Sequence, residues 1–149
     1  MGSRILCPVL VVVFLLLLGA RPASSASPDW TADGIQSEAY LGVSVGAAGD
    51  VNGDGFSDVI VGAYLHDNGE TDEGRVSVYH GSAAGLATSP ARPAESKRGQ
   101  AWCGNSVATA GDVNGDGFSD VIVGAWQYSN GEGQEGRAVV YHGSAAGLS

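Results

Sequence analysis

Two loops of nine residues, 50–58 and 112–120, carry oxygen-bearing side chains at matching positions. In each loop an Asp or Asn stands at positions 1, 3, 5 and 9, and a backbone carbonyl is available at position 7. A tightly wound loop turns alternate groups inward, and such oxygens are the hard ligands that Ca²⁺ prefers. The spacing therefore predicts two calcium sites. Their expected ligands are Asp50, Asn52, Asp54, the Phe56 carbonyl and Asp58, and Asp112, Asn114, Asp116, the Phe118 carbonyl and Asp120.

A bound ion would also relieve the repulsion among the three carboxylates of each loop. Ca²⁺ would change the charge of a loop with three Asp from −3 to −1 and tie the segments on either side together. An EF-hand is the nearest alternative, but its twelfth position requires Glu where Val61 and Val123 stand. An acidic turn that needs no ion is the other alternative.

Both loops belong to a long internal repeat. Residues 38–86 and 100–148 align at a spacing of 62 positions, and 35 of the 49 aligned residues are identical. A unit of about 60 residues that recurs in this way is typical of repeat architectures. We expect each copy to form short strands separated by turns. In the first copy the expected strands lie at 41–48, 59–63 and 75–80, with a weak fourth at 28–34 or 90–96.

The expected strand at 59–63 is apolar on both faces, so it must be covered on both sides. A lone four-stranded sheet leaves one face of that strand in water, whereas stacked sheets cover both. Radial stacking of small blades, as in a β-propeller, meets this need and also hides the sheet edges. The sequence therefore predicts an all-β fold of two propeller blades, either an incomplete propeller or one completed by several chains.

Residues 1–26 have the parts of a secretory signal peptide: a basic Arg4, an apolar run at 5–18 and a short stretch of small and polar residues. The apolar run has 14 residues, and a membrane-spanning helix needs about 20. We therefore expect an exported chain, secreted or at the cell surface, with no membrane span after cleavage. The mature chain would then consist of two repeats, 27–86 and 87–149.

The net charge is −9, from 7 basic and 16 acidic residues. Phosphate backbones and anionic membranes repel such a chain, which argues against a nucleic-acid or membrane-surface partner. The sequence also lacks the His-Glu-x-x-His motif and a phosphate-cradling lysine loop. Because the candidate acid–base carboxylates are assigned to the calcium loops, we expect that the chain is not an enzyme by itself.

The segment 49–63, which recurs unchanged at 111–125, resembles the FG-GAP repeat. This repeat occurs in integrin α-subunits, in glycosylphosphatidylinositol-specific phospholipase D and in many bacterial surface proteins. The resemblance implies a seven-bladed β-propeller, Ca²⁺ on the ten residues named above and, in integrins, extracellular adhesion. Two features depart from the family pattern: the Phe-Gly pair is Leu41-Gly42 and Cys103-Gly104, and two repeats stand in place of seven.

Three functions fit these observations. The leading hypothesis is an exported calcium-binding propeller protein that binds a protein or carbohydrate ligand at the cell surface, as an adhesion module. The second is a piece of a larger exported enzyme, of hydrolase or phospholipase type, with a propeller that is not catalytic. The third is a two-blade subunit of a homo-oligomeric propeller, in which residues 28–34 complete the second blade of a neighbouring chain.

Several other residues have both a structural and a functional interpretation. Cys103 takes the position of Leu41, so we expect a small buried hydrophobe, with an intermolecular disulfide as the alternative. His80 and His142 recur after a strand, and we expect turn residues because no carboxylate or Cys is spaced to assist a metal. The acidic segment 67–73 is expected to be a solvated hairpin tip, or else a site for a cation or a basic partner.

Six aromatic side chains cluster near the expected strand ends. They either pack between blades or line a contact surface for carbohydrate or protein. The six are Trp30, Tyr40, Tyr64, Trp102, Trp126 and Tyr128.

Overall fold

The computed structural model describes residues 26–149, which fold into seven strands and contain no helix. This finding confirms the expected all-β class. The predicted signal peptide lies outside the described residues except for Ala26. Within the described part of the chain, no helix has the length and apolar character to cross a membrane.

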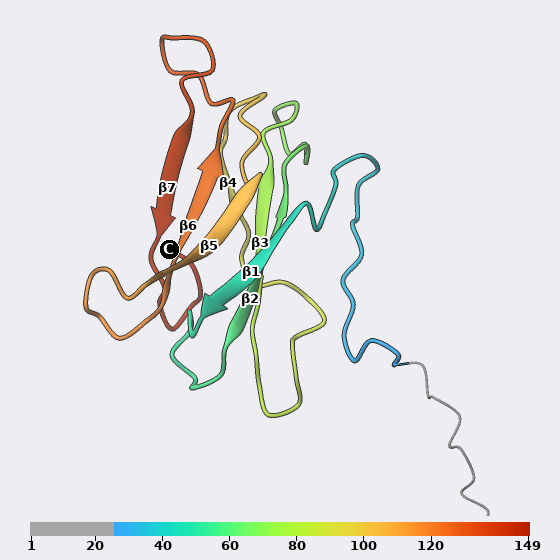
Figure 1. Ribbon diagram of the computed structural model, residues 1–149, viewed down its shortest axis with the longest axis vertical. Coiled ribbons are helices and arrows are strands. Elements are labelled where there is room, and N and C mark those ends of the chain that lie inside the picture. The colour runs from blue at the N-terminus through green and yellow to red at the C-terminus, as the bar shows by residue number, and fades with distance from the viewer. Residues whose placement is uncertain (1–25) are drawn as a thin grey trace, which may run out of the picture.

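Two antiparallel sheets account for all seven strands (Figure 1). In each sheet the strands are ordered as they occur in the chain, so every connection joins neighbours. The first sheet contains β1 (Ser44–Gly49), β2 (Asp58–Ala63), β3 (Arg75–Tyr79) and β4 (Ala94–Glu95). The second contains β5 (Ser106–Gly111), β6 (Asp120–Ala125) and β7 (Arg137–Tyr141).

The expected central strands at 59–63 and 75–80 are confirmed as β2 and β3, and the edges differ from the expectation. The first strand begins at Ser44, because Gly42 takes a positive φ of 93° that an extended strand does not tolerate. The fourth strand is only two residues long. Residues 28–34 form no strand, since they run along the face of the first sheet and not along an edge, with the Trp30 ring against Tyr79.

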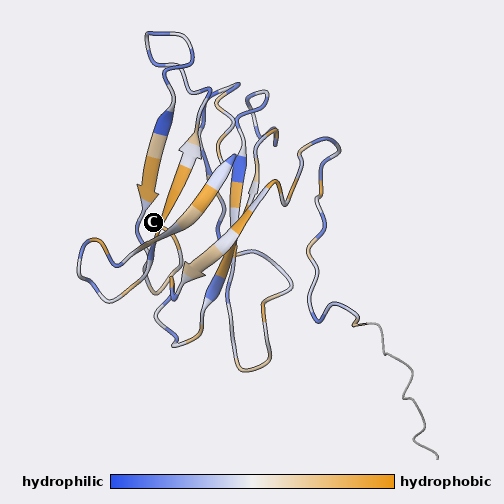
Figure 2. Cartoon of the chain, in the orientation of Figure 1, coloured by the Kyte–Doolittle hydropathy of each residue, from blue (hydrophilic) through white to orange (hydrophobic). Residues whose placement is uncertain are grey.

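The two sheets pack face to face, with β1 against β5. Apolar residues occupy the strands, and the connecting loops are mostly hydrophilic (Figure 2). Ile60, on the face of β2 toward the second sheet, is fully buried, and Val61 on the opposite face is 5% exposed. The structure therefore confirms that β2 is covered on both sides. The buried core also includes Val76, Val78, Val121 and Val123.

Each sheet has an irregularity where its first strand enters the acidic loop. The register shifts between Ala47 and Gly49 in the first sheet and between Thr109 and Gly111 in the second. Both glycines have positive φ angles, 80° for Gly49 and 74° for Gly111. A bulge at this position bends the strand, so both hairpins turn into their loops in the same way.

Candidate metal centre

The loop between β1 and β2 winds around its own acidic side chains. The Asp50 carboxylate accepts hydrogen bonds from the amides of Asp54 (Oδ1, 3.0 Å) and Gly55 (Oδ2, 2.9 Å). The side-chain oxygen of Asn52 accepts from the same Asp54 amide over 3.1 Å. Oxygens at loop positions 1 and 3 therefore converge on one N–H group.

Asp54, at loop position 5, is oriented by its neighbours. Its Oδ1 accepts a hydrogen bond from the Phe56 amide over 2.9 Å, and Asn52 Nδ2 donates to its Oδ2 over the same distance. These bonds from Phe56 and Asn52 lower the pKa of the Asp54 carboxyl. The carboxylate is thus ionised at neutral pH, as a carboxylate ligand of calcium must be.

The second loop repeats this arrangement between β5 and β6. Asp112 accepts from the amides of Asp116 (Oδ1, 3.1 Å) and Gly117 (Oδ2, 2.9 Å), and Asn114 accepts from Asp116 over 3.1 Å. Asp116 in turn accepts from the Phe118 amide over 3.0 Å. The same sequence therefore folds into the same loop twice.

Asp58, at loop position 9, has a different environment. It is 1% exposed, and its two oxygens accept hydrogen bonds from the amides of Val51 and Gly81, each over 2.8 Å. The Val51 bond closes the loop, and the Gly81 bond ties it to the turn after β3. Asp58 therefore holds the loop onto the sheet through buried backbone groups.

Asp120 closes the second loop in the same manner, with Val113 and Gly143 as donors at 2.9 Å each. Burial raises the pKa of this carboxyl, but hydrogen bonds from Gly143, Val113 and His142 outweigh that effect and leave the pKa below its ordinary value. His142 Nδ1 lies 3.3 Å from Asp120 Oδ2. His142 directly follows β7, as expected of a turn residue, and the turn brings its ring back to the Asp120 carboxylate.

The predicted ligands are thus only partly assembled. Positions 1, 3 and 5 gather around backbone amides in both loops, and position 9 turns its oxygens toward buried amides. Among residues 26–149 the structure shows no cluster of three or more Asp, Glu, His or Cys side chains placed to hold a metal ion. The donor types nevertheless suit a hard cation, and each carboxylate oxygen of Asp50 and Asp54 accepts one hydrogen bond and so keeps a second lone pair.

Residues 41–79 and 104–141 match the FG-GAP repeat family. The chain belongs to this family. Each match begins at or just before the first strand of a sheet and ends with its third, so each FG-GAP repeat supplies the three long strands of one blade.

Integrin α-subunits are among the curated relatives. Integrin alpha pat-2 of Caenorhabditis briggsae is 43% identical over 94 residues, 60% of this chain and 8% of that protein. Integrin alpha-3 of Cricetulus griseus is 32% identical over 161 aligned positions, 99% of this chain and 15% of that protein. Integrin alpha-4 of Xenopus laevis is 37% identical over 119 residues, which are 78% of this chain and 11% of that protein. The chain therefore spans less than a sixth of the length of these relatives.

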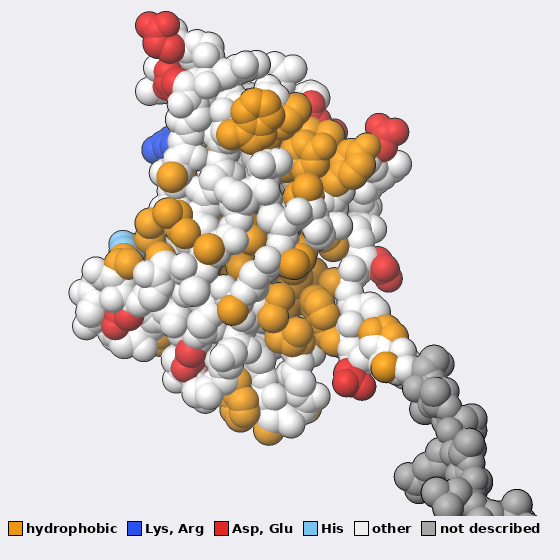
Figure 3. Space-filling model, in the orientation of Figure 1, with side chains coloured by type: hydrophobic (Ala, Val, Ile, Leu, Met, Phe, Trp, Pro, Cys, Tyr) orange, Lys and Arg blue, Asp and Glu red, His pale blue; other side chains and the backbone are white. Residues whose placement is uncertain are grey.

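Four aromatic rings form a ladder across both FG-GAP repeats, at the end of the strands opposite the acidic loops. The ring centroids of Tyr40 and Tyr64 are 5.7 Å apart, those of Tyr64 and Trp102 are 5.2 Å apart, and those of Trp102 and Trp126 are 5.2 Å apart. The outer members are 57% exposed (Tyr40) and 51% exposed (Trp126). Apolar side chains gather on the surface at this end of the molecule (Figure 3). We call these four residues the aromatic ladder.

The other two predicted aromatics pack against the protein. Trp30 donates its indole N–H to the Ala87 carbonyl over 2.9 Å and meets the edge of Tyr79. The guanidinium groups of Arg98 and Arg137 lie 5.2 and 4.9 Å from the Tyr128 ring centroid. The aromatic set therefore divides into a ladder with two exposed ends and two half-buried rings that pack elsewhere.

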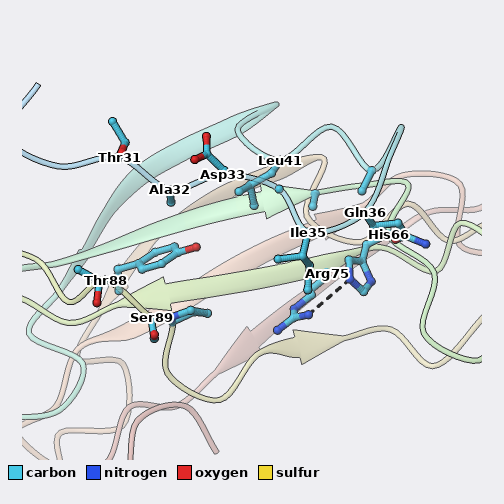
Figure 4. A pocket seen from close by; sticks show the side chains of 15 residues that line it. Thr31, Ala32, Asp33, Ile35, Gln36, Leu41, His66, Arg75, Thr88 and Ser89 are labelled. Atoms are coloured by element: carbon cyan, nitrogen blue, oxygen red, sulfur yellow. Dashed lines mark hydrogen bonds between the residues drawn. The ribbon is translucent and has the colours of Figure 1, made fainter.

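A cavity of about 390 Å³ lies between residues 31–41 and the first sheet. Its polar lining includes His66 and Arg75, with Arg75 Nη1 3.4 Å from His66 Nε2 (Figure 4). Burial and the neighbouring Arg75 charge lower the pKa of His66. A smaller cavity of about 140 Å³ occupies the equivalent place in the second FG-GAP repeat, against Arg137. The recurrence makes this cavity a feature of blade packing.

Residues 42–46 read Gly-Val-Ser-Val-Gly, the spacing that marks nucleophilic serines in some hydrolases, so an interpretation of the sequence as lacking this motif is wrong. Here Ser44 is the first residue of β1, and its hydroxyl donates to the Gly104 carbonyl over 2.6 Å. Such a nucleophile requires a strand-to-helix turn and a base. Ser44 instead joins the two sheets.

Two further expectations can be compared with the structure. Cys103 is 2% exposed, and burial raises the pKa of its thiol to about 12, which confirms the small buried hydrophobe. The acidic segment 67–73 is exposed at its tip, but Glu73 is fully buried, and neither of its carboxylate oxygens has a hydrogen-bond partner. The prediction of a solvated hairpin tip is therefore wrong for Glu73. The Cys103 amide and the Ser96 hydroxyl donate hydrogen bonds to the Glu73 carbonyl and hold this residue in the protein interior.

Proposed function

We propose that this FG-GAP chain is an exported, calcium-stabilised binding module that attaches to a protein or carbohydrate ligand at the cell surface. The observation that supports ligand binding is the aromatic ladder. Aromatic rings bury a large area on binding and lose little side-chain entropy, and their polar atoms accept or donate hydrogen bonds. An exposed row of such rings is a feature of interaction surfaces.

Similarity to known proteins supports adhesion, and similarity to signal peptides supports export. The named relatives are integrin α-subunits, and residues 1–26 have the pattern of a signal peptide. The net charge of −9 disfavours nucleic acid and anionic membrane as partners. We propose binding without catalysis, because Ser44 joins the two sheets and the cavity of about 390 Å³ recurs as a feature of blade packing.

Calcium would be held by the two acidic loops. The ligands we propose are Asp50, Asn52, Asp54, the Phe56 carbonyl and Asp58, with Asp112, Asn114, Asp116, the Phe118 carbonyl and Asp120 in the second loop. When bound, the ion supplies positive charge and cross-links each hairpin. The loop amides already orient positions 1, 3 and 5, while Asp58 and Asp120 anchor the loop to its blade.

The test of ligand binding uses two probe sets, a glycan array and an array of extracellular matrix proteins, with labelled chain in calcium. We expect binding to at least one probe. A Tyr40→Ala/Trp126→Ala variant should bind that probe at least tenfold more weakly, because it removes both exposed ends of the ladder. An Ile35→Ala variant is the control, since Ile35 is 84% exposed and lies outside the ladder and both acidic loops.

The molar mass of every variant is measured in parallel, so that a change in assembly is distinguished from loss of ligand contact. Equal loss in the ladder and control variants would contradict a role for the ladder. Absence of binding to either array would contradict the proposed ligand classes.

A further inference from the structure

Residues that are identical in the two FG-GAP repeats differ sharply in exposure. Three apolar residues of the first repeat are at most 1% exposed, and their counterparts 62 positions later are 38–56% exposed. The pairs are Val51 and Val113, Ile60 and Ile122, and Val78 and Val140. The two residues of each pair have the same side chain, so the difference in exposure comes from the neighbouring residues that cover the first member and not the second.

The second repeat covers the buried members. The Val51 carbonyl accepts a hydrogen bond from the Ser144 amide over 3.0 Å, and Ile60 belongs to one core cluster with Val121 and Val123. Nothing among the described residues takes that place on the second sheet. Val113, Ile122, Trp126 and Val140 therefore form an exposed surface, which we call the back face.

A complementary surface lies on the first repeat. Tyr40, Val43, Val45 and Phe56 are 42–66% exposed, and we call them the front face. Their counterparts in the second repeat face the first sheet, where Phe118 packs so closely on Gly53 that a Cβ there would lie 2.6 Å from its ring. Front and back faces together hold eight of the nine large apolar side chains that are exposed among the described residues.

Polar groups show the same pattern. Between the repeats, Ser44 donates to the Gly104 carbonyl over 2.6 Å, and the Ser119 amide donates to the Asp50 carbonyl over 2.8 Å. The corresponding groups on the outer surfaces are Ser106 and Asp112 at the back and Gly42 and Ser57 at the front. Within the described part of the chain these groups make no equivalent bonds between repeats.

We propose that a second copy of this chain docks head to tail, with its front face on the back face of the first. The two faces are the two halves of the interface that already joins the repeats within one chain, so they match in shape and bonding. The front-side cavity of about 390 Å³ is the counterpart of the cavity of about 140 Å³ on the second sheet, and a docked copy would narrow the front-side cavity. Repeated docking closes a ring or extends a chain of blades.

Head-to-tail docking also accounts for the absence of the expected strand at 28–34. In the first sheet Glu95 of β4 pairs with Arg75 of β3. The counterparts of these two residues are Asp33 and Arg137, and Arg137 belongs to a sheet of only three strands. In the head-to-tail arrangement Asp33 of one copy lies beside Arg137 of the other and provides the fourth strand. Tyr40 of the front face and Trp126 of the back face are also the ends of the aromatic ladder, so this docking and the ligand contact proposed above involve the same two side chains.

The experiment measures molar mass by light scattering for three forms of the purified chain. The back-face variant is Ile122→Lys/Val140→Lys, and the front-face variant is Val43→Lys/Val45→Lys. We expect the original chain to assemble, each variant alone to be monomeric, and an equal mixture of the two to form a dimer of twice the monomer mass. The mixture dimerises because each variant keeps one intact face.

A control variant, Ala84→Lys/Ala146→Lys, adds the same charge at exposed turn positions outside both faces and should assemble like the original chain. Circular dichroism verifies that every variant remains folded. A monomeric original chain at concentrations up to about 1 mM, which populate even weak complexes, would overturn the proposal and leave the back face to a different blade or partner. Self-association of the front-face variant alone would show like-to-like pairing and would also overturn it.

Discussion

Asp50 and Ser119 hydrogen-bond to each other twice across the interface between the two FG-GAP repeats. The Ser119 amide donates to the Asp50 carbonyl over 2.8 Å, and the Asp50 amide donates to Ser119 Oγ over 3.1 Å. Asp50 is the first residue of one acidic loop, and Ser119 immediately precedes the last residue of the other. The first loop is therefore braced by the second repeat, and its conformation depends on blade packing.

Ser119→Ala should lower the free energy of unfolding by about 1 kcal/mol, because it removes the acceptor of one of these two bonds. The measurement is chemical denaturation in the monomeric Ile122→Lys/Val140→Lys background. Ser57→Ala is the matched control, since Ser57 has the same place in the first repeat and is exposed. Equal destabilisation by both substitutions would show that the bond between repeats contributes nothing.

Asp54→Ala together with Asp116→Ala should abolish most of the increase in melting temperature that calcium produces. These carboxylates stand at position 5 of each loop and are exposed. Extracellular calcium modules bind at about 10⁻⁴ to 10⁻³ M, so millimolar calcium should raise the melting temperature of the original chain by several degrees. The measurement is thermal unfolding with calcium and with chelator.

Glu70→Ala together with Glu132→Ala is the control for that experiment. It removes the same charge from the exposed tips of the other two hairpins. The control should retain the full calcium response. An undiminished response in the Asp54/Asp116 variant would place the ion elsewhere.

Glu73→Gln should stabilise the protein at neutral pH. Burial raises the pKa of Glu73, and the nearby Glu95 charge adds to the effect. A raised pKa in the folded state means that ionisation of Glu73 opposes folding. Its penalty is absent below about pH 4, where the carboxyl is protonated in both states. The penalty grows as the pH rises from the unfolded-state pKa to the folded-state pKa and is constant above that.

The measurement for Glu73 is the melting temperature between pH 3 and pH 8. The variant should exceed the original chain by a few degrees at pH 7, and the difference should disappear at the acid end. Glu135→Gln is the control, because Glu135 has the same place in the second repeat and is exposed. A pH-independent difference would indicate that packing, and not charge, causes the effect.

The sequence by itself determined the elements that depend on local order and on repetition. The recurrence of 49–63 at 111–125 and the alternation of apolar residues were enough to predict the central strands, the stacked sheets and the family. The convergence of Asp50 and Asn52 on one amide was also predictable, because both residues lie within four positions of that amide.

Only the tertiary structure decided how each copy of a repeated residue is used. Ile60 and Ile122 have the same local sequence, yet one is fully buried and the other is 38% exposed, because burial depends on the neighbouring blade. The same holds for Glu73 against Glu135, and for the Asp120 carboxylate that reaches His142. A repeat of sequence specifies the shape of a blade, whereas contacts across the interface depend on which faces of the blades meet in space.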